Sequence, residues 1–278
     1  MPAADLAALV DLRYAKEPAP GGAGALAVIT LDRPAARNAY SEAMIDGLCA
    51  ALDAAEGDPE VRCVILTGAG EAFSAGGDLK RMRDHEGMFA GASAELRQRY
   101  IEYIQRVPRR LGLFDKPVVA AIQGAAIGAG LDLACMCDVR IAARGAKLGS
   151  TFVKVGLVPG DGGAYLLART IGFPRALELM LTGRLVDDEE ALRIGLVHQV
   201  VEPAAVMAAA RAAAGAIAEN APIAVRLTKR AAYRSWEGSL EVALELAATF
   251  QAITQRTADH HEAVAALLER RAPSFRGE

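Results

Sequence analysis

Two segments rich in glycine and alanine contain the residues with the clearest chemical use. They are Phe73–Lys80 (FSAGGDLK) and Gly124–Asp132 (GAAIGAGLD), and each lies between a strand-like and a helix-like stretch. Turns of this composition leave backbone N–H groups unpaired and let a ligand approach the main chain closely. Two such turns can direct two N–H donors at one oxygen atom. The pair therefore predicts an oxyanion hole for a carbonyl group.

The histidines and cysteines do not indicate a second kind of chemistry. The four histidines are scattered, and none lies near a serine or cysteine in a pattern typical of a nucleophilic triad. Cys135 and Cys137 form a C-x-C pair without further ligands at the spacing of a zinc site. We expect buried thiols there, no disulfide framework and no metal site.

Strands and helices at regular intervals position the two turns. Val61–Thr67 precedes the first turn, Val118–Gln123 precedes the second, and a helix is predicted from Gly128 to Met136. Ser41 is a suitable N-cap for a helix whose apolar residues recur every three or four positions. Further strands are predicted at residues 25–31, 139–143 and 196–201, and further helices at residues 95–113 and up to residue 171. This alternation of strands and helices predicts an α/β fold.

The composition changes after Pro203. Four helices and no strand are predicted beyond it, at residues 204–220, 223–235, 239–258 and 262–270. We therefore divide the chain into an α/β body at residues 1–203 and a helical C-terminal module at residues 204–278. Residues 1–25 are rich in alanine, proline and glycine, and we expect them to fray before the first strand.

The overall composition excludes several classes of protein. The chain has 278 residues with a net charge of −3, which argues against general affinity for nucleic acid or anionic membranes. The apolar run at residues 117–137 contains Gln123, Asp132 and glycines, so it is predicted to be strand, turn and helix rather than a membrane span. No signal peptide is apparent, and no Walker A or GxGxxG pattern follows a strand. We expect a cytoplasmic protein without nucleic-acid or membrane partners.

The chain resembles the crotonase (enoyl-CoA hydratase/isomerase) superfamily. The resemblance runs from about Leu26 to the C-terminus and follows a series of landmarks in order. They are LDRP at 31–34 followed by Asn38-Ala39, FSAGGDLK at 73–80, KPVVAA at 116–121, GAG at 128–130 before Asp132 and Cys137-Asp138, GLVPG at 156–160, LTG at 181–183, GLV at 195–197, and the tail from Glu262-Ala263 to Phe275.

This resemblance implies a spiral of ββα turns followed by a helical module that forms homotrimers or hexamers. It also implies an acyl-CoA thioester substrate, so coenzyme A enters as part of the substrate and no cofactor is permanently bound. The two oxyanion-hole amides fall on Gly77 and Ala129. The acyl-CoA contacts fall at or near Ala35, Ala36, Arg37, Ala75, Gly77, Asp78, Leu79, Lys80, Gly128, Ala129, Phe152, Pro159 and Gly160.

The chain departs from the family's hydratases at their two glutamates. One of these positions is Asp132, and the other is Phe152, which can neither activate water nor deliver a proton. The related ring isomerases and dehalogenases place an aspartate at the position of Gly160, whereas here the acid is one residue later, at Asp161. Shifting a double bond requires one movable proton and suits a single carboxylate, whereas hydration requires more.

Three aspartates each have two interpretations. Asp132 either carries the proton, with its pKa raised by apolar surroundings, or only makes local hydrogen bonds. Asp161 either acts as a second acid or base or caps the following helix, and capping is favoured. Asp78 is favoured as a structural support of the first turn. The candidate catalytic residues are therefore Gly77, Ala129, Asp132 and Asp161.

The predicted function is that of an enoyl-CoA hydratase/isomerase-type enzyme. It would act on an unsaturated acyl-CoA by stabilising an enolate in the oxyanion hole. Two alternatives stay open. One is another acyl-CoA reaction on the same scaffold, such as isomerisation, hydrolysis or dehalogenation, and the other is a catalytically silent acyl-CoA binder.

Overall fold

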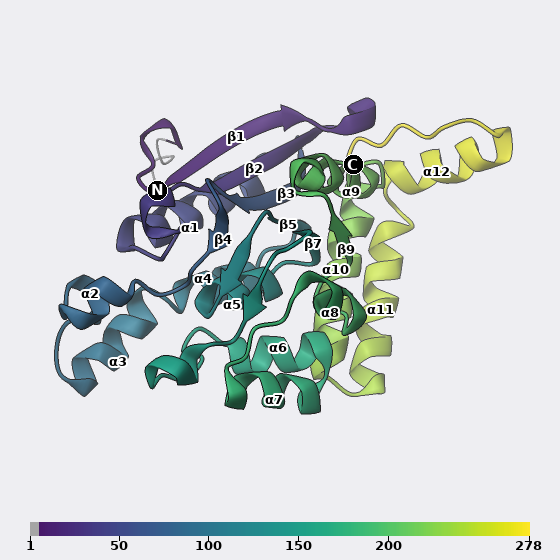
Figure 1. Ribbon diagram of the computed structural model, residues 1–278. Coiled ribbons are helices and arrows are strands. Elements are labelled where there is room, and N and C mark those ends of the chain that lie inside the picture. The colour runs from purple at the N-terminus through teal and green to yellow at the C-terminus, as the bar shows by residue number, and fades with distance from the viewer. Residues whose placement is uncertain (1–5) are drawn as a thin grey trace.

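Nine strands form two sheets in residues 6–278, the part of the chain that the computed structural model describes (Figure 1). The larger sheet has six strands in the order β1-β2-β3-β5-β7-β9, and the smaller has three in the order β4-β6-β8. β1 runs antiparallel to β2, and the other pairings within the two sheets are parallel. The strands are Leu12–Pro18 (β1), Ala25–Leu31 (β2), Val61–Gly68 (β3), Ala72–Ser74 (β4), Val118–Ile122 (β5), Ala125–Ile127 (β6), Val139–Ala143 (β7), Leu148–Gly149 (β8) and Gln199–Val201 (β9).

The chain alternates between the two sheets. β3, β5 and β7 are each followed by a strand of the smaller sheet and then by α2 (Leu79–Arg83), α5 (Ala129–Cys135) or the 3-10 turn η5 (Phe152–Val155). These repeated ββα turns confirm the predicted fold class. Because β4 and β6 pair in parallel, with Ser74 opposite Ala126, the turns that follow them lie next to each other.

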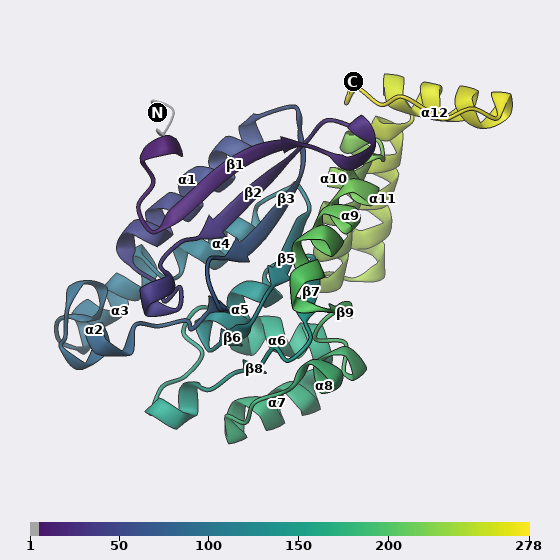
Figure 2. The ribbon, with the colours of Figure 1, turned by 45° about the horizontal axis from the view of Figure 1, so that its top comes forward.

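Side chains of β2 alternate between two helical layers. Ala27 and Ile29 belong to a core that includes α1 (Glu42–Gly57), whereas Leu26 and Val28 belong to a second core with α9 (Val206–Ala218). Figure 2 shows α9 on one face of the sheet and α1 on the other. Successive residues of a strand point to opposite faces, so an apolar strand such as β2 requires a cover on both sides.

The remaining helices surround these layers and extend the C-terminal end. They are α3 (Ser93–Glu102), α4 (Arg106–Gly112), α6 (Gly163–Ile171), α7 (Phe173–Thr182), α8 (Asp188–Arg193), α10 (Pro222–Glu237), α11 (Leu240–Thr254) and α12 (Ala258–Glu269), with 3-10 turns at Leu6–Ala8, Pro20–Gly22, Pro34–Ala36, Gly87–Phe89 and Pro203–Ala205. α10 and α11 lie side by side, and α12 projects away from the body (Figure 1). No helix in residues 6–278 combines the length and the apolar character needed to cross a membrane.

The N-terminal segment corrects one prediction. Residues 1–25 were expected to fray, but Leu12–Pro18 pairs along its whole length with β2, and Leu12 is buried. Residues 1–5 lie outside the described part of the chain. The helix predicted at residues 95–113 is two helices, because the backbone at Tyr103 leaves the helical conformation.

The boundary at residue 203 between the α/β body and the helical module is still a prediction. The packing of α9, the first long helix after it, is relevant to where the body ends. Ala210, Ala214 and Ala218 of this helix are buried in the same core as Ile65 and Val119 of the sheet. Small residues at every fourth position let the helix approach the sheet closely. The first helix after the boundary therefore packs as part of the α/β body.

Candidate active site

The two glycine-rich turns meet in direct contact. Gly76 has a left-handed φ of 79°, and a methyl group on it would lie 2.6 Å from the Ile127 carbonyl oxygen and 2.7 Å from the Ala129 nitrogen. Gly130 likewise lies against the Ser74 carbonyl without room for a side chain. Only glycine satisfies both the backbone conformation and the close approach. These positions explain why both turns are rich in glycine.

The meeting point leaves backbone donors available. Gly128, with a φ of 56°, precedes α5, and its carbonyl accepts from the amides of Leu131 and Asp132. The amide of Ala129 begins the helix, so it has no acceptor within it. Gly77 and Ala129 both line the same cavity. The pair of oxyanion donors at these two residues stays a prediction, and the shared cavity is where a carbonyl oxygen could meet both amides.

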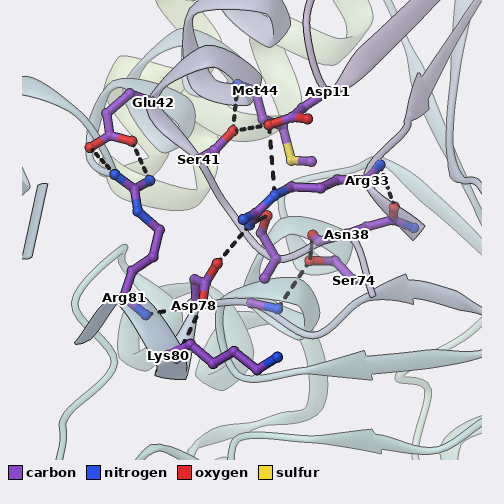
Figure 3. A network of polar contacts seen from close by, with 12 residues as sticks. Asp11, Arg33, Asn38, Ser41, Glu42, Met44, Ser74, Asp78, Lys80 and Arg81 are labelled. Carbon is purple, nitrogen blue, oxygen red and sulfur yellow. Dashed lines mark hydrogen bonds and ion pairs between the residues drawn. The ribbon is translucent and has the colours of Figure 1, made fainter. Parts of the chain in front are cut away.

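Asn38 and Ser74 fix the first turn from within (Figure 3). The Asn38 amide donates to the carbonyls of Ala69, Ala72 and Phe73, while its oxygen accepts from the Arg33 amide at 2.9 Å. The Ser74 hydroxyl donates to the Asn38 carbonyl at 2.8 Å and accepts from the Gly76 amide at 3.1 Å. Because both side chains are buried, this network holds the turn in one conformation.

Asp78 supports the same turn from its other end (Figure 3). It caps α2 by accepting from the amides of Lys80 and Arg81, and it pairs with Arg33 at 2.8 Å. Burial acts to raise the pKa of Asp78, but the hydrogen bond from Arg33 and the two amides outweigh it and lower the pKa. Asp78 is thus an ionised structural carboxylate, in agreement with the favoured interpretation.

A cavity of about 100 Å³ opens between the two turns. Its walls are largely apolar, as expected of a pocket for an acyl group. Eight of the candidate site residues line it, namely Ala75, Gly77, Leu79, Gly128, Ala129, Phe152, Gly160 and Asp161. The other lining residues are Tyr40, Met82, Tyr100, Ile104, Ile127, Thr151, Val155 and Leu157.

Asp132 and Asp161 form a buried pair at this cavity. Their exposed fractions are 0% and 1%, and none of their four carboxyl oxygens has a hydrogen-bond partner in residues 6–278. Asp161 lines the cavity, whereas Asp132, on α5, is not among its lining residues. A methyl group on Gly163 would overlap the Asp132 carboxylate, so the absence of a side chain two residues after Asp161 leaves the space for it.

Both carboxyl groups of the pair hold their protons more tightly than usual. Burial raises the pKa of both carboxyl groups, and the charge of Asp161 raises that of Asp132 further. Two carboxyl groups in one enclosure cannot both ionise easily. The pair therefore retains a proton to higher pH than an exposed aspartate would, and Asp161 is its member that lines the cavity.

The favoured capping role of Asp161 is wrong. The N-cap of α6 is Gly162, and no side chain caps this helix. The error has a local cause, because an aspartate two residues before a helix satisfies the sequence pattern of a cap. Its burial against Asp132 depends on the distant α5, which sequence spacing does not reveal.

Tyr40 is a site residue that the sequence reasoning missed. It is 1% exposed, it lines the cavity, and its hydroxyl has no partner among the described residues. Its amide donates to the Gly76 carbonyl at 2.8 Å. The only signal in the sequence was its place directly after the landmark Asn38-Ala39.

Some of the predicted acyl-CoA contacts are not among the residues that line the cavity. Arg37 accepts from the Ala75 amide through its carbonyl at 2.9 Å, which joins residues 35–37 to the first turn. Ala35, Arg37 and Lys80 are exposed, whereas Ala36 and Pro159 are half-buried. All four cysteines are free and buried, and residues 6–278 contain no cluster of three or more acidic, histidine or cysteine side chains able to hold a metal ion.

Known proteins match nearly the whole chain. A family profile described as enoyl-CoA hydratase/isomerase matches residues 21–278. The short-chain-enoyl-CoA hydratase of Clostridium acetobutylicum is 38% identical over 89% of this chain and 93% of its own. The (E)-benzylidenesuccinyl-CoA hydratase of Thauera aromatica is 38% identical over 91% and 96%. The crystal structure of an enoyl-CoA hydratase from Bacillus anthracis superposes with a TM-score of 0.87 at 34% identity and covers 95% of this chain and 99% of that one.

Proposed function

The chain belongs to the enoyl-CoA hydratase/isomerase family and is an enzyme of that type, and we propose that Asp161 is the base that moves a proton on its unsaturated acyl-CoA substrate. The observation that carries this proposal is the cavity. It is lined by the two amide-bearing residues and by the carboxyl group of Asp161.

The amides of Gly77 and Ala129 would hold the thioester oxygen. As a proton leaves the α-carbon, negative charge develops on that oxygen, and each donor aimed at it contributes about 3 kcal/mol. The network around Asn38 and Asp78 supports this role, because it fixes the first turn before the substrate arrives. The adenine and pantetheine parts of coenzyme A would contact residues 35–37 and 78–80, of which Ala35, Arg37, Leu79 and Lys80 are exposed. No further cofactor enters the proposal.

Isomerisation of the double bond suits this geometry best. The Asp161 carboxylate would take a proton from the α-carbon of a 3-enoyl-CoA and return it to the γ-carbon of the dienolate. One carboxylate at the cavity suffices for both steps. Asp132 does not line the cavity and would act only through Asp161. Phe152 adds an apolar wall where hydration would require a second polar group.

Hydration is the second candidate, and the relatives favour it. Two of the matched proteins carry hydratase names, one for short-chain enoyl-CoA and one for (E)-benzylidenesuccinyl-CoA. A pair of carboxyl groups that shared one proton would meet the formal requirement for activating water and protonating the α-carbon, and burial raises the pKa of both Asp132 and Asp161.

Assembly with further copies of the chain completes the proposal. Large apolar side chains on α10–α12 are exposed, among them Trp236 at 67%, Leu240 at 69% and Leu267 at 79%. A surface of this kind marks a protein contact. We expect a homotrimer or hexamer in which these helices pack against neighbouring subunits.

The test compares two substrates in one absorbance assay. The purified enzyme is supplied with crotonyl-CoA or a 3-enoyl-CoA, and loss or gain of the conjugated thioester is followed. We expect the 3-enoyl-CoA to be converted faster, and Asp161→Asn to lose both activities while binding acyl-CoA. Asp84→Asn, on the exposed end of α2, is the matched control. Full activity of Asp161→Asn would refute the assignment, and faster turnover of crotonyl-CoA would select hydration.

A further inference from the structure

Tyr40 lies where the two halves of the site meet. Its side chain lines the cavity together with Gly77, Ala129 and Asp161. Its backbone amide holds the Gly76 carbonyl at 2.8 Å and so fixes the first turn from behind. One residue therefore contacts the oxyanion turn through its main chain and the acid-lined cavity through its side chain.

The hydroxyl of Tyr40 is not explained by packing. It is buried and has no hydrogen-bond partner within residues 6–278. A buried donor without a partner disfavours the folded state, and phenylalanine would fill the same space without that cost. Because the Tyr40 hydroxyl is buried in the cavity wall without a partner, it is available to donate to another group in the same cavity.

The charges around Tyr40 identify that group. Burial raises the pKa of its hydroxyl well above the usual value, and the charges of Asp161 and then Asp132 raise it further, so the hydroxyl keeps its proton. Burial also raises the pKa of the other titratable groups nearby and keeps them neutral. They are Tyr100 on α3, which lines the cavity, Cys49 on α1, and Cys135 and Cys137, whose thiols reach a pKa of about 12. Of the two aspartates that act on Tyr40, the one that lines the same cavity is Asp161.

We propose that Tyr40 is a positioning residue for Asp161, and that its hydroxyl donates to a water in the shared cavity which in turn donates to the Asp161 carboxylate. The proposal rests on the assigned role of Asp161 as the base. A donor to the ionised form of a carboxyl group lowers its pKa. Tyr40 thereby offsets part of the effect of burial and keeps Asp161 ionised, and oriented toward the substrate, down to lower pH.

Tyr40→Phe tests this directly, because it removes one oxygen and keeps the ring. We expect kcat to fall about tenfold with little change in KM, and the acidic limb of the pH–rate profile to move up by about one pH unit. The melting temperature should not fall, since the hydroxyl has no partner in the protein. Tyr14→Phe, on the half-buried face of β1, is the matched control and should leave all four quantities unchanged.

Infrared spectroscopy gives a readout that does not depend on turnover. The carboxyl C=O stretch of the pair, assigned with Asp161→Asn, should titrate at higher pH in Tyr40→Phe than in the parent. If the unsubstituted enzyme converts neither crotonyl-CoA nor a 3-enoyl-CoA, the proposed function is refuted. The infrared titration alone then tests whether Tyr40 lowers the pKa of Asp161. An unchanged titration, an unchanged pH–rate profile, or a loss of kcat accompanied only by a lower melting temperature would each overturn the proposal.

Discussion

Asp132 and Asp161 have the same side chain but unequal positions. Asp161 lines the cavity and Asp132 does not, although both are almost fully buried. Groups with different access to a substrate differ in catalytic role even when they share a proton. Substituting one aspartate at a time can therefore show which of the two contributes more to turnover.

We expect Asp161→Asn to lower turnover by about 10²–10⁴-fold, the range for loss of a general base. Asp132→Asn should cost less, because the asparagine amide can still donate to the Asp161 carboxylate. Steady-state kinetics with a 3-enoyl-CoA at several pH values would compare the two variants. The opposite order would assign the proton transfer to Asp132.

The same pair makes stability depend on pH. The folded pKa of each carboxyl group lies above the unfolded value of 3.8, so the fold binds protons more tightly than the unfolded chain. The resulting stabilisation is fully present below about pH 3.8 and is lost as pH rises through the folded pKa values.

We therefore expect the double variant Asp132→Asn/Asp161→Asn to melt above the parent at pH 8, with a smaller difference at pH 4. Thermal unfolding measured across this range would show whether the gap widens with pH. Asp84→Asn, whose parent carboxyl pKa is lowered by Arg83, should show no such gain. A constant gap would mean that the buried pair does not titrate between these pH values.

At the scale of secondary structure, the site depends on two strands of the smaller sheet and on the turns after them. β4 and β6 are only three residues long, yet their pairing brings Gly76 against Ala129. The helices that follow, α2 and α5, begin at this point. The geometry of the proposed oxyanion hole is thus set by backbone contact between two turns.

Gly76→Ala should separate the two turns. The added methyl group would displace the Ala129 amide, and alanine is strained at this positive φ. Gly145→Ala is the matched control, since Gly145 has a φ of 81° and open space around it. Both variants should lose about 1–2 kcal/mol of stability from the backbone, but only Gly76→Ala should lose most of its turnover. Equal activities at equal stability would argue against the oxyanion assignment.

The sequence predicted the strands and helices whose buried apolar residues recur at regular intervals. Ala25–Leu31 is β2 with the predicted bounds, and Ser41 accepts from the Met44 amide at the start of α1. The edge strand β1 was missed because most of its side chains are exposed and charged or small. β4, β6 and β8 were missed because two or three residues carry no readable period.

The sequence predicted the parts of the candidate site that belong to glycine-rich backbone turns, and it did not predict the side chains around them. Gly77 and Ala129 lie together as expected because glycine-rich turns have a local signature. Asp161 was favoured as a cap and Tyr40 was not considered, since the burial of both depends on segments more than twenty residues away. The spacing of nearby residues in the sequence does not show which distant residues a side chain will contact in the fold.

At the scale of the whole molecule, the C-terminal helices carry an apolar surface that the chain itself does not cover. Leu267 and Leu268 on the projecting α12 are both 79% exposed. We expect the enzyme to be oligomeric at micromolar concentration, and Leu267→Glu/Leu268→Glu to lower its mass in solution. Sedimentation velocity measures this. Leu113→Glu, at an exposed site after α4, should leave the assembly intact. A monomeric parent would refute the proposed assembly.

The position of α9 has a consequence for how the protein is made. β2 and β3 leave the ribosome early, but Val206–Ala218, which covers one of their faces, follows more than a hundred residues later. At about 5–20 residues per second, a nascent chain therefore presents the apolar face of Leu26, Val28 and Ile65 for roughly ten seconds. During synthesis, that face stays open to contact with other molecules, and it closes only after Ala218 has been made.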